Sequence, residues 1–157
     1  MIVNGNDVER EYAVLRSGLL GFNDKPILEA IVGVTAATYG AFFGALSAIT
    51  YDRQILVARV GTELDETPRN ESFCAVAIQQ PGEPLIVADA QKDSRFDRLA
   101  LVTGFPHLRF YAGMPIVDRA GYALGALCIA DSRPLEGTCD PTELMIKARE
   151  IERMLTP

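Results

Sequence analysis

The sequence has few of the residues on which metal sites and many hydrolytic sites depend. It contains one histidine, His107, no tryptophan, and three cysteines at unrelated spacings without a C-x-x-C pair. A structural zinc site uses about four His or Cys ligands, so we expect no metal centre. The odd number of cysteines, and an N-terminus without a basic-then-apolar pattern, favour the reducing cytoplasm over a secreted location.

Basic residues are also in the minority. Fifteen Lys and Arg stand against 21 Asp and Glu, which gives a net charge of −6, and no window holds a run of basic residues. An acidic surface without a basic patch repels phosphate backbones. We therefore expect no nucleic acid among the partners of this chain.

Long hydrophobic runs are absent except for 22 uncharged residues from Ala30 to Tyr51, enough to cross a bilayer. Three Gly, three Thr and one Ser in this run oppose membrane insertion. The spacing of its apolar residues also changes, from helical (Ile27, Ile31, Val34, Thr38) to strand-like from Phe43 onward. We expect a helix followed by a buried strand, and no membrane segment.

The composition that remains is that of one globular domain covering residues 1–157, with 48% hydrophobic and 23% charged residues. Apolar periodicity, caps and turn signals predict its elements in chain order. They are helices over 8–20 and from 24, strands over 42–50 and 53–60, a loop over 61–70, a helix over 72–78, a strand over 85–88, a short helix over 96–102, strands over 108–117 and 122–130, and a helix over 140–155. Hairpin connections between these strands predict an α+β fold with a mainly antiparallel sheet.

Motifs of several large enzyme classes are missing. No G-x-G-x-x-G or G-K-[ST] loop could hold nucleotide phosphates, and neither G-x-S-x-G nor H-E-x-x-H occurs. We expect no cofactor and assign no catalytic residue. His107 is interpreted as a loop residue bonded to backbone, and Asp89 and Asp93 as turn and capping residues.

Two cysteines lie within predicted elements. Cys74 falls in the first turn of a helix, where unpaired N–H groups favour a thiolate, but apolar neighbours favour an inert buried thiol. Cys128 lies between Leu127 and Ile129 in a strand and is expected in the core. A thiol oxidoreductase that uses Cys74 or Cys128 stays an alternative.

Four segments carry a resemblance to a known family: Ser72–Cys74, Val87–Phe96, Arg109–Val117 and Leu124–Asp131. They resemble the GAF domain family, in particular the bacterial sensory GAF domains of histidine kinases and diguanylate cyclases. The resemblance implies a five- or six-stranded antiparallel sheet. It places the first, second and last helices on one face, and a pocket closed by loops and short helices on the other.

Subgroups of the family with known chemistry match less well. Of the cyclic-nucleotide signature only Asp65-Glu66 is present, and no Cys-His pair could attach a bilin. Free methionine sulfoxide reductases carry their attacking cysteine in a strand comparable to His107–Tyr111, which has none. The resemblance therefore implies a non-enzymatic sensory domain. A relative of those reductases, or a dimerisation module without a ligand, are the alternatives.

The sensory function implies an unknown small-molecule ligand and a signalling partner such as a histidine kinase or diguanylate cyclase. The candidate ligand-binding residues are Phe73, Cys74, Asp89, Phe96, His107, Arg109, Tyr111 and Met114.

GAF domains commonly pair through their terminal helices, so we expect a homodimer formed by residues 1–20 and 140–155. The predicted interface comprises two apolar stripes with matching spacing: Val8, Tyr12, Leu15 and Leu19 in the first helix, and Leu144, Ala148, Ile151 and Leu155 in the last. The competing interpretation is a monomer that buries both stripes within one subunit.

Overall fold

The structure is a computed structural model that describes residues 5–155, and its centre is one six-stranded sheet. All neighbouring strands pair antiparallel, in the order β3-β2-β1-β6-β5-β4. The strands are β1 (Phe43–Ile49), β2 (Arg53–Val60), β3 (Glu66–Pro68), β4 (Leu85–Val87), β5 (Phe110–Val117) and β6 (Ala123–Asp131). The predicted α+β fold is confirmed.

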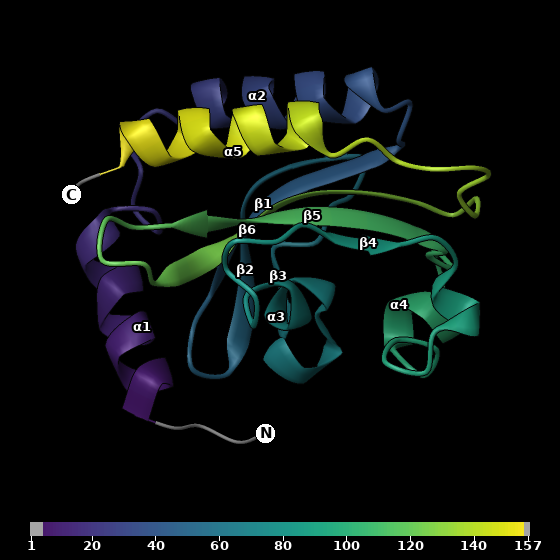
Figure 1. The fold of residues 1–157 in the computed structure, drawn as a ribbon, viewed down its shortest axis with the longest axis horizontal. Coiled ribbons are helices and arrows are strands. Elements are labelled where there is room, and N and C mark those ends of the chain that lie inside the picture. Colours follow the sequence, from purple (N-terminus) through teal and green to yellow (C-terminus); the bar gives the residue numbers. More distant parts are fainter. Residues whose placement is uncertain (1–4, 156–157) are drawn as a thin grey trace.

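Two long helices, α2 (Lys25–Thr38) and α5 (Thr142–Met154), lie next to each other over one face of the sheet (Figure 1). Asp140, two residues before α5, accepts hydrogen bonds from the amide and hydroxyl of Thr142 at 3.0 and 2.7 Å, while Pro141 takes the N-cap position. The side chains between helices and sheet form one hydrophobic core, with Leu28, Ile129 and Ile151 completely buried.

The uncharged run divides as predicted, because α2 ends at Thr38 and β1 begins at Phe43. The buried face of α2 differs from the expected stripe. It comprises Leu28, Ile31, Val32, Thr35 and Ala36, whereas Ile27 and Val34 are exposed. Within residues 5–155, no helix is long and apolar enough to cross a membrane.

Helix α1 (Gly5–Ser17) lies at the end of the sheet, beside the β5–β6 turn (Figure 1). Its inward face carries a buried ion cluster. Arg10 and Arg69 donate to the carboxylate of Asp7 at 3.0 and 2.8 Å. Arg10 also donates to the carbonyl of Ala123 in β6, and Arg69 to that of Thr50 before β2. The cluster therefore ties α1 to the sheet and to the segment after β3.

The opposite face of the sheet carries short elements instead of long helices (Figure 1). They are η1 (Arg69–Glu71), α3 (Phe73–Ala77), η2 (Ala90–Lys92) and α4 (Ala100–Thr103). The predicted loop over 61–70 is wrong in part, because β3 pairs there with β2. Its three residues are too few to give a periodic signal.

Candidate functional site

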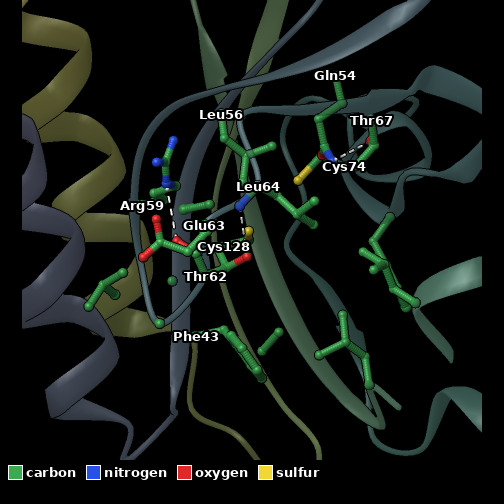
Figure 2. A pocket seen from close by; sticks show the side chains of 18 of the residues that line it. Phe43, Gln54, Leu56, Arg59, Thr62, Glu63, Leu64, Thr67, Cys74 and Cys128 are labelled. Carbon is green, nitrogen blue, oxygen red and sulfur yellow. Dashed lines mark hydrogen bonds between the residues drawn. The ribbon is translucent and has the colours of Figure 1, made fainter. Parts of the chain in front are cut away.

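A cavity of about 1170 Å³ opens on this second face, above β1 and β2 (Figure 2). Small-molecule sites usually measure about 300–1,000 Å³, so the space suffices for an organic ligand. Strands β1, β2 and β6 supply its floor, while the β2–β3 loop, α3 and the segment from Leu101 to Leu108 supply its walls. Phe43, Leu56 and Ala45 make part of this lining apolar.

Three stacked aromatic rings form one wall. Phe73 of α3 stacks on Tyr111 of β5 with ring centroids 4.9 Å apart, and on Phe96 behind it at 4.5 Å. Ser72 caps α3 by accepting from the amide of Ala75 at 3.1 Å, which fixes the start of that helix. Phe73 and Tyr111 line the cavity, and Phe96 supports Phe73 from the core.

Two thiols lie at the base of the same wall. The Sγ atom of Cys74 is 3.1 Å from the hydroxyl oxygen of Tyr111, and both Cys74 and Cys128 line the cavity. A hydrogen bond from the Cys128 thiol lowers the pKa of Cys74, burial opposes this, and hydrogen bonds with Ser47 and Tyr111 add to the lowering. The same thiol–thiol hydrogen bond, together with burial, raises the pKa of Cys128.

Polar side chains close the two ends of the cavity. At one end the amide of Gln54 donates to Thr67 at 3.0 Å and accepts from Ser72 at 2.8 Å, which joins β2, β3 and the cap of α3. At the other end Arg59 forms an ion pair with Asp65 and donates to the carbonyl of Thr62 at 3.1 Å, holding the β2–β3 loop (Figure 2).

The predicted ligand-binding residues divide between the cavity and its surroundings. Phe73, Cys74 and Tyr111 line it. Met114 lies instead in the helix-side core and is fully buried there, because side chains alternate along β5 and an even-numbered residue faces away from Tyr111. The prediction for Met114 is therefore corrected.

Three further candidates hold the backbone beside the cavity and are not among the residues that line it. Asp89 caps η2 by accepting from the amide of Gln91 at 3.1 Å. Arg109 donates to the carbonyls of Val102 and Leu108, both at 3.0 Å, and thereby anchors α4. His107 is exposed, and its amide donates to the carbonyl of Gly104 at 2.7 Å, in line with its interpretation as a loop residue.

Sequence reasoning missed the contribution of β1, β2 and the loop after β2. Phe43, Gln54, Leu56 and Arg59 line the cavity although no motif includes them. The signal that could have found them is strand alternation combined with the hairpin between β1 and β2, since both strands lie on the floor of the site.

The predicted dimer residues also separate into two groups. Val8, Tyr12 and Leu15, hereafter the α1 stripe, are 47%, 58% and 64% exposed and border a hollow of about 250 Å³. The other residues lie in or against the helix-side core: Leu19, Leu144, Ala148, Ile151 and Leu155. The second stripe packs within the subunit, so of the two predicted stripes the α1 stripe is the one that the described residues leave exposed.

Among residues 5–155, no three His, Cys, Asp or Glu side chains form a group that could hold a metal ion. The site therefore consists of an apolar cavity, a stacked aromatic wall, two thiols and partnered polar groups at the ends. Tyr111 cannot act as a base toward Cys74 near neutral pH, because burial and the nearby thiols raise its pKa well above the usual value.

Comparison with known proteins agrees with this architecture. A cyclic di-GMP phosphodiesterase of Pseudomonas aeruginosa is 36% identical over 125 residues, which are 80% of this chain but 21% of that protein. The chain thus spans about a fifth of this relative's length. The GAF domain of an Acinetobacter phosphoenolpyruvate-protein phosphotransferase superposes with a TM-score of 0.66 at 13% identity, covering 97% of this chain and 94% of that one.

A free methionine-R-sulfoxide reductase of Neisseria meningitidis, solved with its substrate, superposes with a TM-score of 0.65 at 14% identity, covering 98% of this chain and 92% of that one. At such identities the likeness shows the fold alone. The sequence pattern of the GAF domain family matches residues 25–147, which include α2, all six strands and the first part of α5. The chain belongs to the GAF domain family.

Proposed function

We propose that this chain is a non-enzymatic sensory domain that binds a small organic molecule in the cavity. The observation that carries the proposal is the cavity itself, about 1170 Å³ with apolar walls and polar groups at both ends. Such a site suits a ligand with an apolar middle and polar ends. Burial of its apolar surface provides affinity, and the polar ends orient it.

The polar groups at the cavity support binding over catalysis. Gln54 and Arg59 already bond to neighbouring protein groups, and Glu71 accepts from the amide of Ala100 at 2.9 Å. These contacts give them a structural use. Cys74 has a phenol beside it, and a phenol that keeps its proton cannot act as a general base toward the thiol. A thiol oxidoreductase is the second candidate, favoured by the two thiols.

We further propose that the domain forms a homodimer through the α1 stripe and passes the binding signal to an attached or associated signalling enzyme. The exposed stripe supports the dimer, because a helix pair buries such side chains. The relative of this chain named as a cyclic di-GMP phosphodiesterase supports an enzyme of signalling as the output. A histidine kinase or diguanylate cyclase are further partners of that kind.

Binding is tested with tryptophan as a probe, since the chain has none. Phe43→Trp places one fluorophore in the cavity, and Tyr12→Trp places one on the exposed α1 stripe as control. Native mass spectrometry of protein from its own host identifies a retained molecule. We expect that molecule to shift the emission of Phe43→Trp only. An empty cavity in host protein, with no response to a metabolite library, would favour the dimerisation module without a ligand.

The dimer is tested by light scattering of Leu15→Glu, with Arg16→Glu as the matched control on the exposed neighbour. A charge on the α1 stripe disrupts the apolar contact without touching the core. We expect the mass to halve in Leu15→Glu and to stay unchanged in Arg16→Glu. A parent protein that is monomeric at tens of micromolar would refute the interface.

A further inference from the structure

The thiols of Cys74 and Cys128 approach each other from distant parts of the chain. Cys74 lies in α3 and Cys128 in the central strand β6, and each lines the cavity (Figure 2). Neither is needed to complete a metal site or a disulfide, since all three cysteines are free. The pair is the one nucleophilic cluster of the described residues that ligand binding leaves unexplained.

The sheet explains why these groups meet. Cys128 pairs directly with Gly113 in the β5–β6 register. A Cβ atom on Gly113 would lie 2.1 Å from the Tyr111 hydroxyl, so this hydroxyl occupies the space that the missing side chain leaves. Directly opposed residues place their Cβ atoms about 4.5–5.5 Å apart, which brings the hydroxyl close to Cys128. The Sγ atom of Cys74, in α3, lies 3.1 Å from the same hydroxyl oxygen.

This surrounding favours one thiolate in the pair. A thiolate needs hydrogen-bond donors in place of water, and the Tyr111 hydroxyl lies 3.1 Å from the Sγ atom of Cys74. The thiolate is the form of cysteine that attacks an oxidant. The exposed fractions, 1% for Cys74 and 9% for Cys128, restrict access to small reagents that enter through the cavity.

We propose that Cys74 and Cys128 form a reversible disulfide when a small hydroperoxide enters the cavity. The Cys74 thiolate attacks one peroxide oxygen, the O–O bond breaks, and the leaving oxygen takes a proton, giving sulfenic acid and water or an alcohol. The Cys128 sulfur then attacks the Cys74 sulfur, the S–O bond breaks, and a second water leaves with the Cys128 proton. The two cysteines are oxidised by two electrons, and the peroxide is reduced by two.

The bond would alter the site without any ligand. It joins α3 to β6, fixing the wall that carries Phe73 against the floor, and removes both thiol hydrogens from the cavity. This inference goes beyond the proposed ligand binding and does not depend on it. A redox-inert pair would leave the ligand proposal intact, and an empty cavity would leave the thiol chemistry intact.

The test uses the Cys139→Ser protein. Trypsin leaves Cys128 and Cys139 in one peptide, 120–147, because Pro134 blocks cleavage after Arg133. The replacement makes Cys128 the one cysteine of that peptide. Native protein is treated with a few equivalents of hydrogen peroxide, then alkylated under denaturing conditions. We expect a loss of two hydrogens, about 2 Da, with no alkylation, and a link between peptides 70–92 and 120–147. Dithiothreitol should restore two alkylatable thiols.

Single replacements identify the attacking thiol. In the same background, Cys128→Ser should leave a sulfenic acid on Cys74 that a dimedone reagent traps, and Cys74→Ser should leave Cys128 at least tenfold less reactive. Circular dichroism checks that both variants are folded. The proposal is overturned if both thiols of the native Cys139→Ser protein stay alkylatable after peroxide, or if the link forms only in urea.

Discussion

Asp131 at the end of β6 bonds to the residue that precedes β1, and Asp131→Asn measures the strength of the contacts of its carboxylate. Its carboxylate accepts from the amide of Phe42 at 3.0 Å and from the amide and guanidinium of Arg133 at 2.9 to 3.1 Å. The hydrogen bonds from the Arg133 side chain lower the pKa of Asp131 from 3.8 to about 2, burial opposes this, and the amides of Arg133 and Phe42 assist.

The size of the effect follows from this pKa. A carboxyl whose pKa falls that far on folding stabilises the native state by about 2 kcal/mol at neutral pH. The Arg133 side chain is 77% exposed, so water screens part of the interaction. We expect Asp131→Asn to lower the free energy of unfolding by about 1–2 kcal/mol near pH 7.

The direction of the pKa shift determines how this stability difference changes with pH. The folded-state pKa of Asp131 is depressed, so its contribution is present above about pH 4 and lost as pH falls toward about 2. Urea unfolding followed by far-UV circular dichroism at about pH 7, 5, 4 and 3 should show the two proteins converging only at the acidic end. Asp52→Asn, in the exposed β1–β2 turn, is the control for loss of one charge. A pH-independent difference, or an equal loss in the control, would refute the reasoning.

Three glycine substitutions test the packing in the same urea assay. Gly113→Ala puts a Cβ 2.1 Å from the Tyr111 hydroxyl, so the buried ring must shift; we expect a loss of about 1–3 kcal/mol, and an unchanged stability would contradict the contact. Gly125→Ala puts a Cβ 1.8 Å from the backbone oxygen of Ser47, which only separation of β1 from β6 can relieve, so we expect little folded protein. Gly33→Ala in α2 meets nothing within 4 Å and should stabilise by about 0.5–1 kcal/mol, since alanine has the higher helix propensity.

Strand alternation illustrates what the sequence can predict within one strand, namely the face of the sheet on which each side chain lies. Tyr111 and Met114 lie three residues apart in one predicted strand, and the period of two already places them on opposite faces. The structure confirms that geometry, with Tyr111 beside the cavity and Met114 in the helix-side core. The helical stripe of Leu144, Ala148 and Ile151 could not be assigned in the same way. A stripe that packs on the sheet and one that meets a second subunit have the same period.

The end of the cavity at β3 could not be predicted from local patterns for a different reason. Gln54 and Thr67 are joined by a hydrogen bond across β2 and β3, yet β3 is three residues long and carries Pro68. Such a strand exists because β2 offers it an edge, and no propensity within the segment specifies it. The site therefore depends on contacts between segments, whereas the family motifs identified only its aromatic and thiol wall.

The ion cluster beneath α1 determines the roll angle of that helix. Asp7 and Arg10 turn inward and meet Arg69, and this orientation rotates the α1 stripe toward solvent. The inward face also buries Ala13 and Val14, while the larger apolar side chains of the α1 stripe stay exposed. Separating buried ion-paired groups is costly, so these contacts disfavour rotations of α1 that would part Asp7 and Arg10 from Arg69. Loss of the charge on Asp7 should therefore allow α1 to rotate about its own axis, so that the α1 stripe turns toward its own subunit.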